Sequence, residues 1–250
     1  MPGPKGINEA DGFPDVGAGK EDKGKGRTAL QRAGSPVLLR IVKNEAAALS
    51  ADVELLFFGS DDFPSASLEA LQLCQFLAES GPRIRLNVHD SKNDKALCES
   101  LGILFFPAMV VRGKNRGCLR FLGTPAGQCL RMLADMLGLA STGEPGLPAG
   151  ALSRLLSVKR PVELRIFVRP DSEPCRRVAL VGAGLATASA LVRTEVVNHL
   201  GFPVMSKRYK VGAVPRTVVN GRAEIDGARG AEDFVDRVLG ALVAQPDMHR

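Results

Sequence analysis

The segment Pro170–Cys175 combines turn-forming residues with a cysteine that could take part in thiol chemistry. It follows an apolar, strand-like run at 162–168 and precedes a segment with the pattern of a helix. A helix that begins directly after a strand presents free N–H groups and the positive end of its dipole, and both stabilise a thiolate. Two cysteines separated by two residues at such a junction support thiol–disulfide exchange. Here Ser172 stands at the first position and Cys175 at the second, so only half of such a pair is present.

The composition bounds the class of protein. The chain has 250 residues, of which 45% are hydrophobic, enough for one large or two small domains. No apolar run approaches the roughly 20 residues of a membrane-spanning helix. The first residues also lack the apolar segment of a secretory signal. We therefore expect a cytoplasmic protein without membrane contact.

The metal-binding residue types are few and scattered. The five cysteines are odd in number, never form a Cys-x-x-Cys pair, and have no neighbouring histidine in the sequence. This argues against a disulfide framework and a zinc site, and we expect neither a metal nor another cofactor. The four cysteines besides Cys175 fall on predicted helices and a strand and are expected to pack: Cys74, Cys98, Cys118 and Cys129. A net charge of +6 with one tyrosine and no tryptophan gives no support for a nucleic-acid partner.

The hydrophobic pattern predicts the same order of elements twice. Residues 35–140 and 145–244 each begin with a helix and continue as strand, helix, strand, helix, strand, strand, helix. A stretch rich in glycine and proline at 141–146 separates them. Low apolar content predicts a disordered tail over residues 1–34, and residues 245–250 form a short C-terminal tail.

Corresponding landmarks recur at a nearly constant spacing. The tripeptide Val-Glu-Leu occurs at 53–55 and at 162–164, and other landmark pairs keep this separation to within a residue. The pairs are Val53 and Val162, Asp62 and Asp171, Pro107 and Pro215, and Gly113 and Gly221. Four landmarks with one offset indicate a duplicated domain.

This pattern resembles the tandem thioredoxin-fold proteins. A proline, Pro107 or Pro215, directly precedes the first hairpin strand of each half, and in that fold this proline is cis and faces the redox motif. The run Arg120–Gly127 is similar to the R-[FY]-x-G-x-P-x-G that closes the first fold in the glutaredoxin-like protein disulfide oxidoreductases and in the N-terminal domain of the alkyl hydroperoxide reductase flavoprotein. The resemblance covers about 35–243 and implies an α/β protein of two tandem thioredoxin-like folds.

The resemblance also implies roles for the motif residues. Ser172 takes the place of the nucleophilic cysteine and Cys175 that of the resolving cysteine, while the first half carries Phe63 and Ala66 at these places. A serine hydroxyl cannot exchange with a disulfide, although it is a good N-cap for a helix. Two-cysteine turnover within this motif is therefore excluded, unless Cys175 uses another cysteine.

Two interpretations of Cys175 remain open. It is either a small packing residue or a monothiol redox residue. In the second case Arg176, Lys210 and Arg216 would surround the helix start, lower the pKa of the thiol and bind an anionic thiol such as glutathione. The alternative for these cations is a solvated surface. A redox role implies a thiol- or disulfide-bearing protein or peptide as partner.

The sequence offers two alternatives to a redox role, peptide binding and dinucleotide binding. Val214, directly before Pro215, lies where relatives pair their backbone with an extended peptide, so a non-catalytic adaptor that binds a protein or peptide at the Pro215 face is the alternative. The glycines at 178–186 also resemble a dinucleotide-binding turn. That interpretation is disfavoured because Thr187 replaces the third glycine and Glu195 comes too soon.

Overall fold

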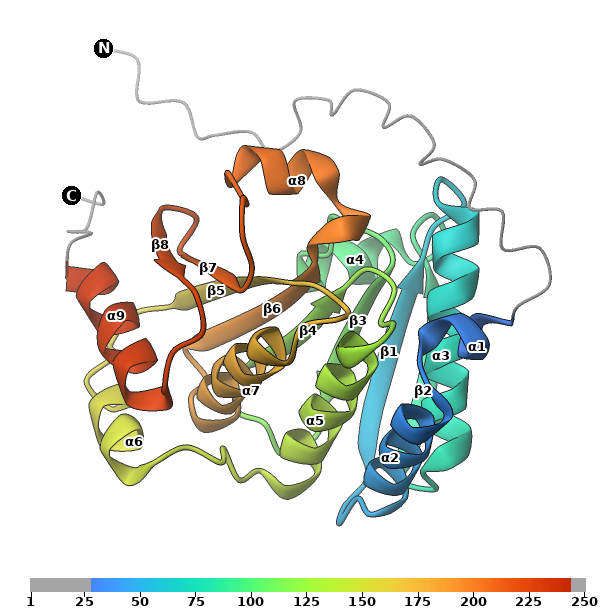
Figure 1. Cartoon of the computed structure of the whole chain (residues 1–250), viewed down its shortest axis with the longest axis horizontal. Helices are drawn as coiled ribbons and strands as arrows, with labels where there is room; N and C mark the ends of the chain where they lie inside the picture. Colours follow the sequence, from blue (N-terminus) through green and yellow to red (C-terminus); the bar gives the residue numbers. More distant parts are fainter. Residues whose placement is uncertain (1–27, 244–250) are drawn as a thin grey trace.

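The computed structural model describes residues 28–243, which form one eight-stranded sheet with helices on both faces (Figure 1). Most of the predicted N-terminal tail and all of the C-terminal tail lie outside these residues. The strands are β1 (Val53–Gly59), β2 (Ile84–Asp90), β3 (Ala108–Arg112), β4 (Cys118–Leu122), β5 (Val162–Val168), β6 (Val192–Asn198), β7 (Arg216–Val219) and β8 (Ala223–Asp226). The helices are α1 (Ala29–Ala33), α2 (Pro36–Ala47), α3 (Pro64–Ser80), α4 (Lys95–Leu101), α5 (Gln128–Thr142), α6 (Ala149–Leu155), α7 (Glu173–Ala188), α8 (Pro203–Arg208) and α9 (Ala231–Val243), with a short 3-10 helix η1 (His199–Gly201).

The sheet consists of two four-stranded units of the same topology. Its order is β2-β1-β3-β4-β6-β5-β7-β8, with the first two strands of each unit parallel and the hairpin strands antiparallel. The units join where β4 pairs in parallel with β6, from Cys118 opposite Arg193 to Leu122 opposite Val197. The predicted α/β class and the repeated order of elements are confirmed.

Alternating side chains divide the core into two layers. Val53, Leu55 and Phe57 of β1 point into the larger cluster, beneath α2, α3, α5, α6, α7 and α9. Leu56 and Phe58 point to the opposite face, where α4 and α8 cover a smaller cluster. A strand covered on both faces reads as a continuous apolar run, which is why β1 is conspicuous in the sequence.

Local signals account for several element boundaries. The Ser35 hydroxyl accepts a hydrogen bond from the Leu38 amide (3.2 Å) and caps α2, as predicted. Three residues, 220–222, connect β7 to β8, and the Arg222 amide donates to the Val219 carbonyl at 3.1 Å. Asn220 and Gly221, at the centre of this turn, both have positive φ, 49° and 69°.

The predicted extent of the disordered N-terminal tail is wrong. The tail expected to be disordered through residue 34 contains α1, which Thr28 caps and which buries Ala29 and Ala33. A short helix forms here because Ala33 packs on the larger core cluster.

Residues 178–186 lie inside α7, so they are neither the strand nor the turn of a dinucleotide-binding fold. Gly182 instead lets α7 pack closely on Ile166 and Thr194.

No helix among residues 28–243 combines the length and the apolar character needed to cross a membrane.

Candidate functional site

The strand register brings the predicted motif residues of the second half to one end of the sheet. Phe167, next to the end of β5, pairs with Arg216 at the start of β7. Pro215 therefore lies beside the loop that leads from β5 to Ser172. The Val214–Pro215 and Phe106–Pro107 peptide bonds are both cis.

Ser172 acts as the N-cap of α7. Its hydroxyl oxygen accepts a hydrogen bond from the Cys175 amide at 3.3 Å, and Pro174 occupies the first turn. A proline costs nothing there, because the amide hydrogen it lacks would have no partner within the helix. The local role expected for Ser172 is thus seen in the structure.

The Cys175 side chain is buried within the core. The residue is 0% exposed and belongs to the larger hydrophobic cluster. Burial raises the pKa of its thiol and outweighs the hydrogen bonds from Ser172 and the Arg169 backbone, which favour the thiolate. The prediction that the pKa of the Cys175 thiol is lowered, as a monothiol role requires, is therefore wrong. Removal of the thiol from water raises the pKa by more than the helix start lowers it.

The predicted cations do not surround the thiol. Arg176 forms a two-pronged ion pair with Asp135 of α5, with both N···O distances 2.8 Å, and a third contact to Glu173. Arg216 pairs with Asp226 at 2.8 Å and also with Glu224, both on β8. The arginine charges are thus neutralised by neighbouring carboxylates.

Lys210 remains exposed, with a left-handed backbone (φ 50°), on the loop that leads to Val214 and Pro215. Val214 is half-buried and Pro215 is buried.

A second buried thiol lies near Cys175. The start of α5 contacts the loop before α7, where the Gln128 amide donates to the Pro170 carbonyl at 2.6 Å. Cys129 belongs to the same core cluster as Cys175. Burial raises the pKa of the Cys129 thiol, and negative charge on Cys175 raises it further. The sequence assigned Cys129 only a packing role, and its neighbourhood with Cys175 depends on the contact between α5 and α7.

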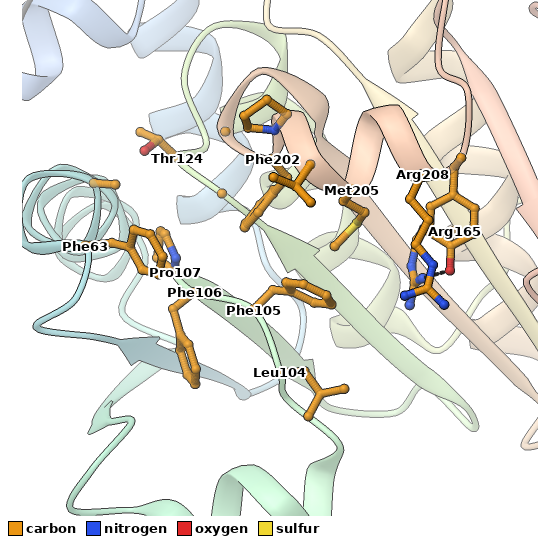
Figure 2. A pocket seen from close by; sticks show the side chains of 16 residues that line it. Phe63, Leu104, Phe105, Phe106, Pro107, Thr124, Arg165, Phe202, Met205 and Arg208 are labelled. Atoms are coloured by element: carbon orange, nitrogen blue, oxygen red, sulfur yellow. Dashed lines mark hydrogen bonds between the residues drawn. The ribbon is translucent and has the colours of Figure 1, made fainter. Parts of the chain in front are cut away.

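A cavity of about 360 Å³ lies between the two halves (Figure 2). The first half lines it with side chains from the start of α3 and from the loop before β3: Phe63, Ala66, Leu104, Phe105, Phe106 and Pro107. The second half contributes α8 and the adjoining residues, including Phe202, Met205, Arg208 and Tyr209, together with Arg165 of β5. The positions that correspond to Ser172 and Cys175, Phe63 and Ala66, thus face a cavity.

The sequence pattern did not identify this cavity. The sequence features that could have indicated it are Phe63, directly before a proline, and the apolar run at 104–106, directly before Pro107. The contribution of α8 depends on the pairing of β4 with β6, which sequence spacing does not show.

The two halves, their shared order and their prolines together identify the architecture. The chain has the tandem thioredoxin fold. Neither a protein-family model nor a curated protein matches the sequence. Among solved structures, a protein disulfide oxidoreductase from Aeropyrum pernix superposes with a TM-score of 0.75 at 23% identity, covering 86% of this chain and 96% of that chain. The alkylhydroperoxide reductase protein AhpF from Enterococcus faecalis superposes with a TM-score of 0.74 at 20% identity, covering 82% of this chain and 99% of that chain.

A more distant solved structure, Sso1120 from Sulfolobus solfataricus, superposes with a TM-score of 0.54 at 18% identity, covering 76% of this chain and 99% of that chain. These similarities establish the fold that the residue pattern implied. At such identities they concern the architecture, so the activity has to be argued from the chain's own residues.

Proposed function

We propose that this tandem thioredoxin-fold protein is a non-catalytic adaptor that binds an extended peptide segment of a partner protein at Val214, beside Pro215. The observation that carries the proposal is the state of Cys175: its thiol is buried and has a raised pKa, and Ser172 holds the place of a nucleophile. Peptide binding through backbone hydrogen bonds needs no thiolate and survives the loss of the cysteine pair.

The backbone at Val214 supports this binding mode. The ladder of β7 begins at Arg216, and the Pro215 carbonyl accepts from the Gly227 amide at 2.9 Å. Within residues 28–243, the amide and carbonyl of Val214 make no backbone hydrogen bond. They offer one donor and one acceptor to an incoming strand. The neighbouring Gly212 and Ala213 are exposed, so access to this edge is open.

The proposal can be tested with a random octapeptide library presented on beads to the labelled protein. Selected peptides, titrated against ¹⁵N-labelled protein, are expected to shift the amide signals of residues 212–214 and 216. They should also slow hydrogen exchange at the Val214 amide. Cys175→Ala should bind the same peptides with unchanged affinity. Selected peptides that leave residues 212–216 unaffected, or that need the Cys175 thiol, would contradict the adaptor function.

A monothiol redox role through Cys175 is the second candidate. The hydrogen bonds from Ser172 and from the Arg169 backbone favour the thiolate and are the observation that supports it. This role predicts that incubation with oxidised glutathione forms a mixed disulfide at Cys175, with release of one reduced glutathione. Mass spectrometry of the native protein would detect the adduct, and its absence under conditions that modify Cys118 would exclude this candidate.

A further inference from the structure

We propose that the cavity between the two halves binds a small apolar carboxylate, with its hydrocarbon chain among the phenylalanines and its carboxylate on Arg208. This site is separate in its chemistry from the peptide edge at Val214, and it does not depend on the proposed function.

The cavity has the size and the lining of a small-molecule site. Its volume of about 360 Å³ falls at the lower end of the usual range for ligand pockets, about 300–1,000 Å³. At about 30 Å³ for each water-sized group, it would hold roughly twelve non-hydrogen atoms. Most of the side chains that face it are apolar, which favours a hydrocarbon over a sugar or a nucleotide.

The apolar walls come from both halves and face one another (Figure 2). The rings of Phe105 and Phe202 meet edge to face, with their centroids 6.1 Å apart. Met205 is almost fully buried beside them. Phe63 and Leu104 remain 47% and 57% exposed although both line the cavity. A ligand that covers these two side chains would remove apolar surface from water, which favours binding.

The charges around the cavity select an anion. Arg165 is neutralised by Glu195 at 2.6 Å and Glu163 at 2.9 Å, and it donates to the Tyr209 hydroxyl at 2.6 Å. Arg208, which lies over the ring of Tyr209, has no carboxylate within ion-pair distance among residues 28–243. None of the residues that line the cavity is acidic.

Arg208 is therefore the uncompensated charge at one end of an apolar space. An apolar molecule with a terminal carboxylate complements both features, because a guanidinium binds a carboxylate through two parallel hydrogen bonds.

Sodium decanoate is a suitable probe, because its anion has twelve non-hydrogen atoms, and decan-1-ol is the matched uncharged compound. Isothermal titration of the full chain should show saturable binding of decanoate. Arg208→Gln should weaken decanoate binding about tenfold, the loss typical of one charge-assisted hydrogen bond, and leave decanol binding unchanged. Lys207→Gln removes an exposed cation one position earlier on α8, which does not line the cavity, and should change neither affinity.

A second variant tests the cavity itself. Ala66→Phe places a ring in the space and should abolish the binding of both compounds, while the circular dichroism spectrum stays that of the wild type. The proposal is overturned if decanoate does not bind the wild-type protein. It is also overturned if Ala66→Phe keeps wild-type affinity, or if Arg208→Gln and Lys207→Gln weaken decanoate binding equally.

Discussion

At the residue scale, Cys175 shows two opposing influences on a single thiol. The start of α7 and the cap by Ser172 favour the thiolate, whereas removal from water favours the neutral thiol. In this chain the second influence is larger. A thiol that is both inaccessible and protonated reacts slowly with any electrophile.

The five cysteines should therefore differ in their rate of alkylation. Cys118 is half-buried, while Cys74, Cys98, Cys129 and Cys175 are buried. We expect iodoacetamide to modify Cys118 first in the native protein at neutral pH, as measured by mass spectrometry of tryptic peptides. Cys118→Ala should remove the fast phase and Cys175→Ala should leave it unchanged. Fast modification of Cys175 would restore the redox interpretation.

His199 should make stability depend on pH. Partial burial, and to a lesser extent the charge of Arg169, lower the pKa of its imidazole in the folded state. The unfolded chain then binds a proton more readily, so this contribution is complete above the unfolded pKa of about 6.5 and is lost as the pH falls below it. Urea unfolding at pH 5, 7 and 8 should show a smaller loss of stability on acidification in His199→Gln than in wild type. An identical loss in both proteins would contradict this role.

Local residue roles were predictable from the sequence, and their environments were not. The N-cap role of Ser172 depends on three neighbouring residues, so the pattern alone indicates it. The burial of Cys175 and the pairing of Arg176 with Asp135 depend on how α5 packs against α7. These contacts join residues about forty positions apart, and no local pattern shows them.

At the element scale, a buried ionic network connects the strands at the junction of the two halves. Glu195 of β6 contacts Arg120 of β4 at 3.1 Å and Arg165 of β5 at 2.6 Å. The side chains of Glu195 and Arg120 are 3% and 4% exposed. Arg120 also donates to the carbonyls of Leu101 and Gly102, at the end of α4.

Glu195→Gln should destabilise the protein strongly. The change leaves the buried guanidinium of Arg120 and the half-buried one of Arg165 without their common carboxylate, and loss of one partner of a buried ion pair costs about 3–5 kcal/mol. Glu163→Gln is the matched control, because Glu163 is 42% exposed and its pair with Arg165 is worth less than about 1 kcal/mol. Equal unfolding free energies for the two variants in urea would show that the network contributes little.

The sequence could not assign this role to Glu195. In the sequence this residue has a possible role only as the poorly placed acidic residue of a dinucleotide-binding motif. Strand periodicity identified β4 and β6 separately, but the pairing of strands from different halves is set by tertiary packing. The same limit explains why the cavity beneath α8 was missed while Pro107 and Pro215 were found.

At the scale of the whole molecule, the two halves form one structural unit. The sheet is continuous across β4 and β6, and the larger hydrophobic cluster contains side chains of both halves. Opening this junction would expose the apolar faces of α5 and α7 and the edges of two buried strands.

Unfolding should therefore be a single cooperative transition. Tyr209 is the only tyrosine and the chain has no tryptophan, so intrinsic fluorescence reports on the second half. The accessibility of Cys74, a buried residue of α3, reports on the first half. Both signals should change at the same urea concentration, and Glu195→Gln should lower both midpoints together. A lower midpoint for either half would show that the junction opens first.

The parallel pairing of β4 with β6 also determines where the loops that follow β1 and β5 lie, which lead to α3 and α7. Strands β1, β4, β6 and β5 all run in one direction, so the loops that follow β1 and β5 emerge from the same edge. Four strand spacings separate β1 from β5 in the sheet, roughly 19 Å at about 4.8 Å each. About six extended residues span that length. One ligand with two short recognition elements could thus engage both loops at once, and such bivalent attachment would gain avidity without any additional contact.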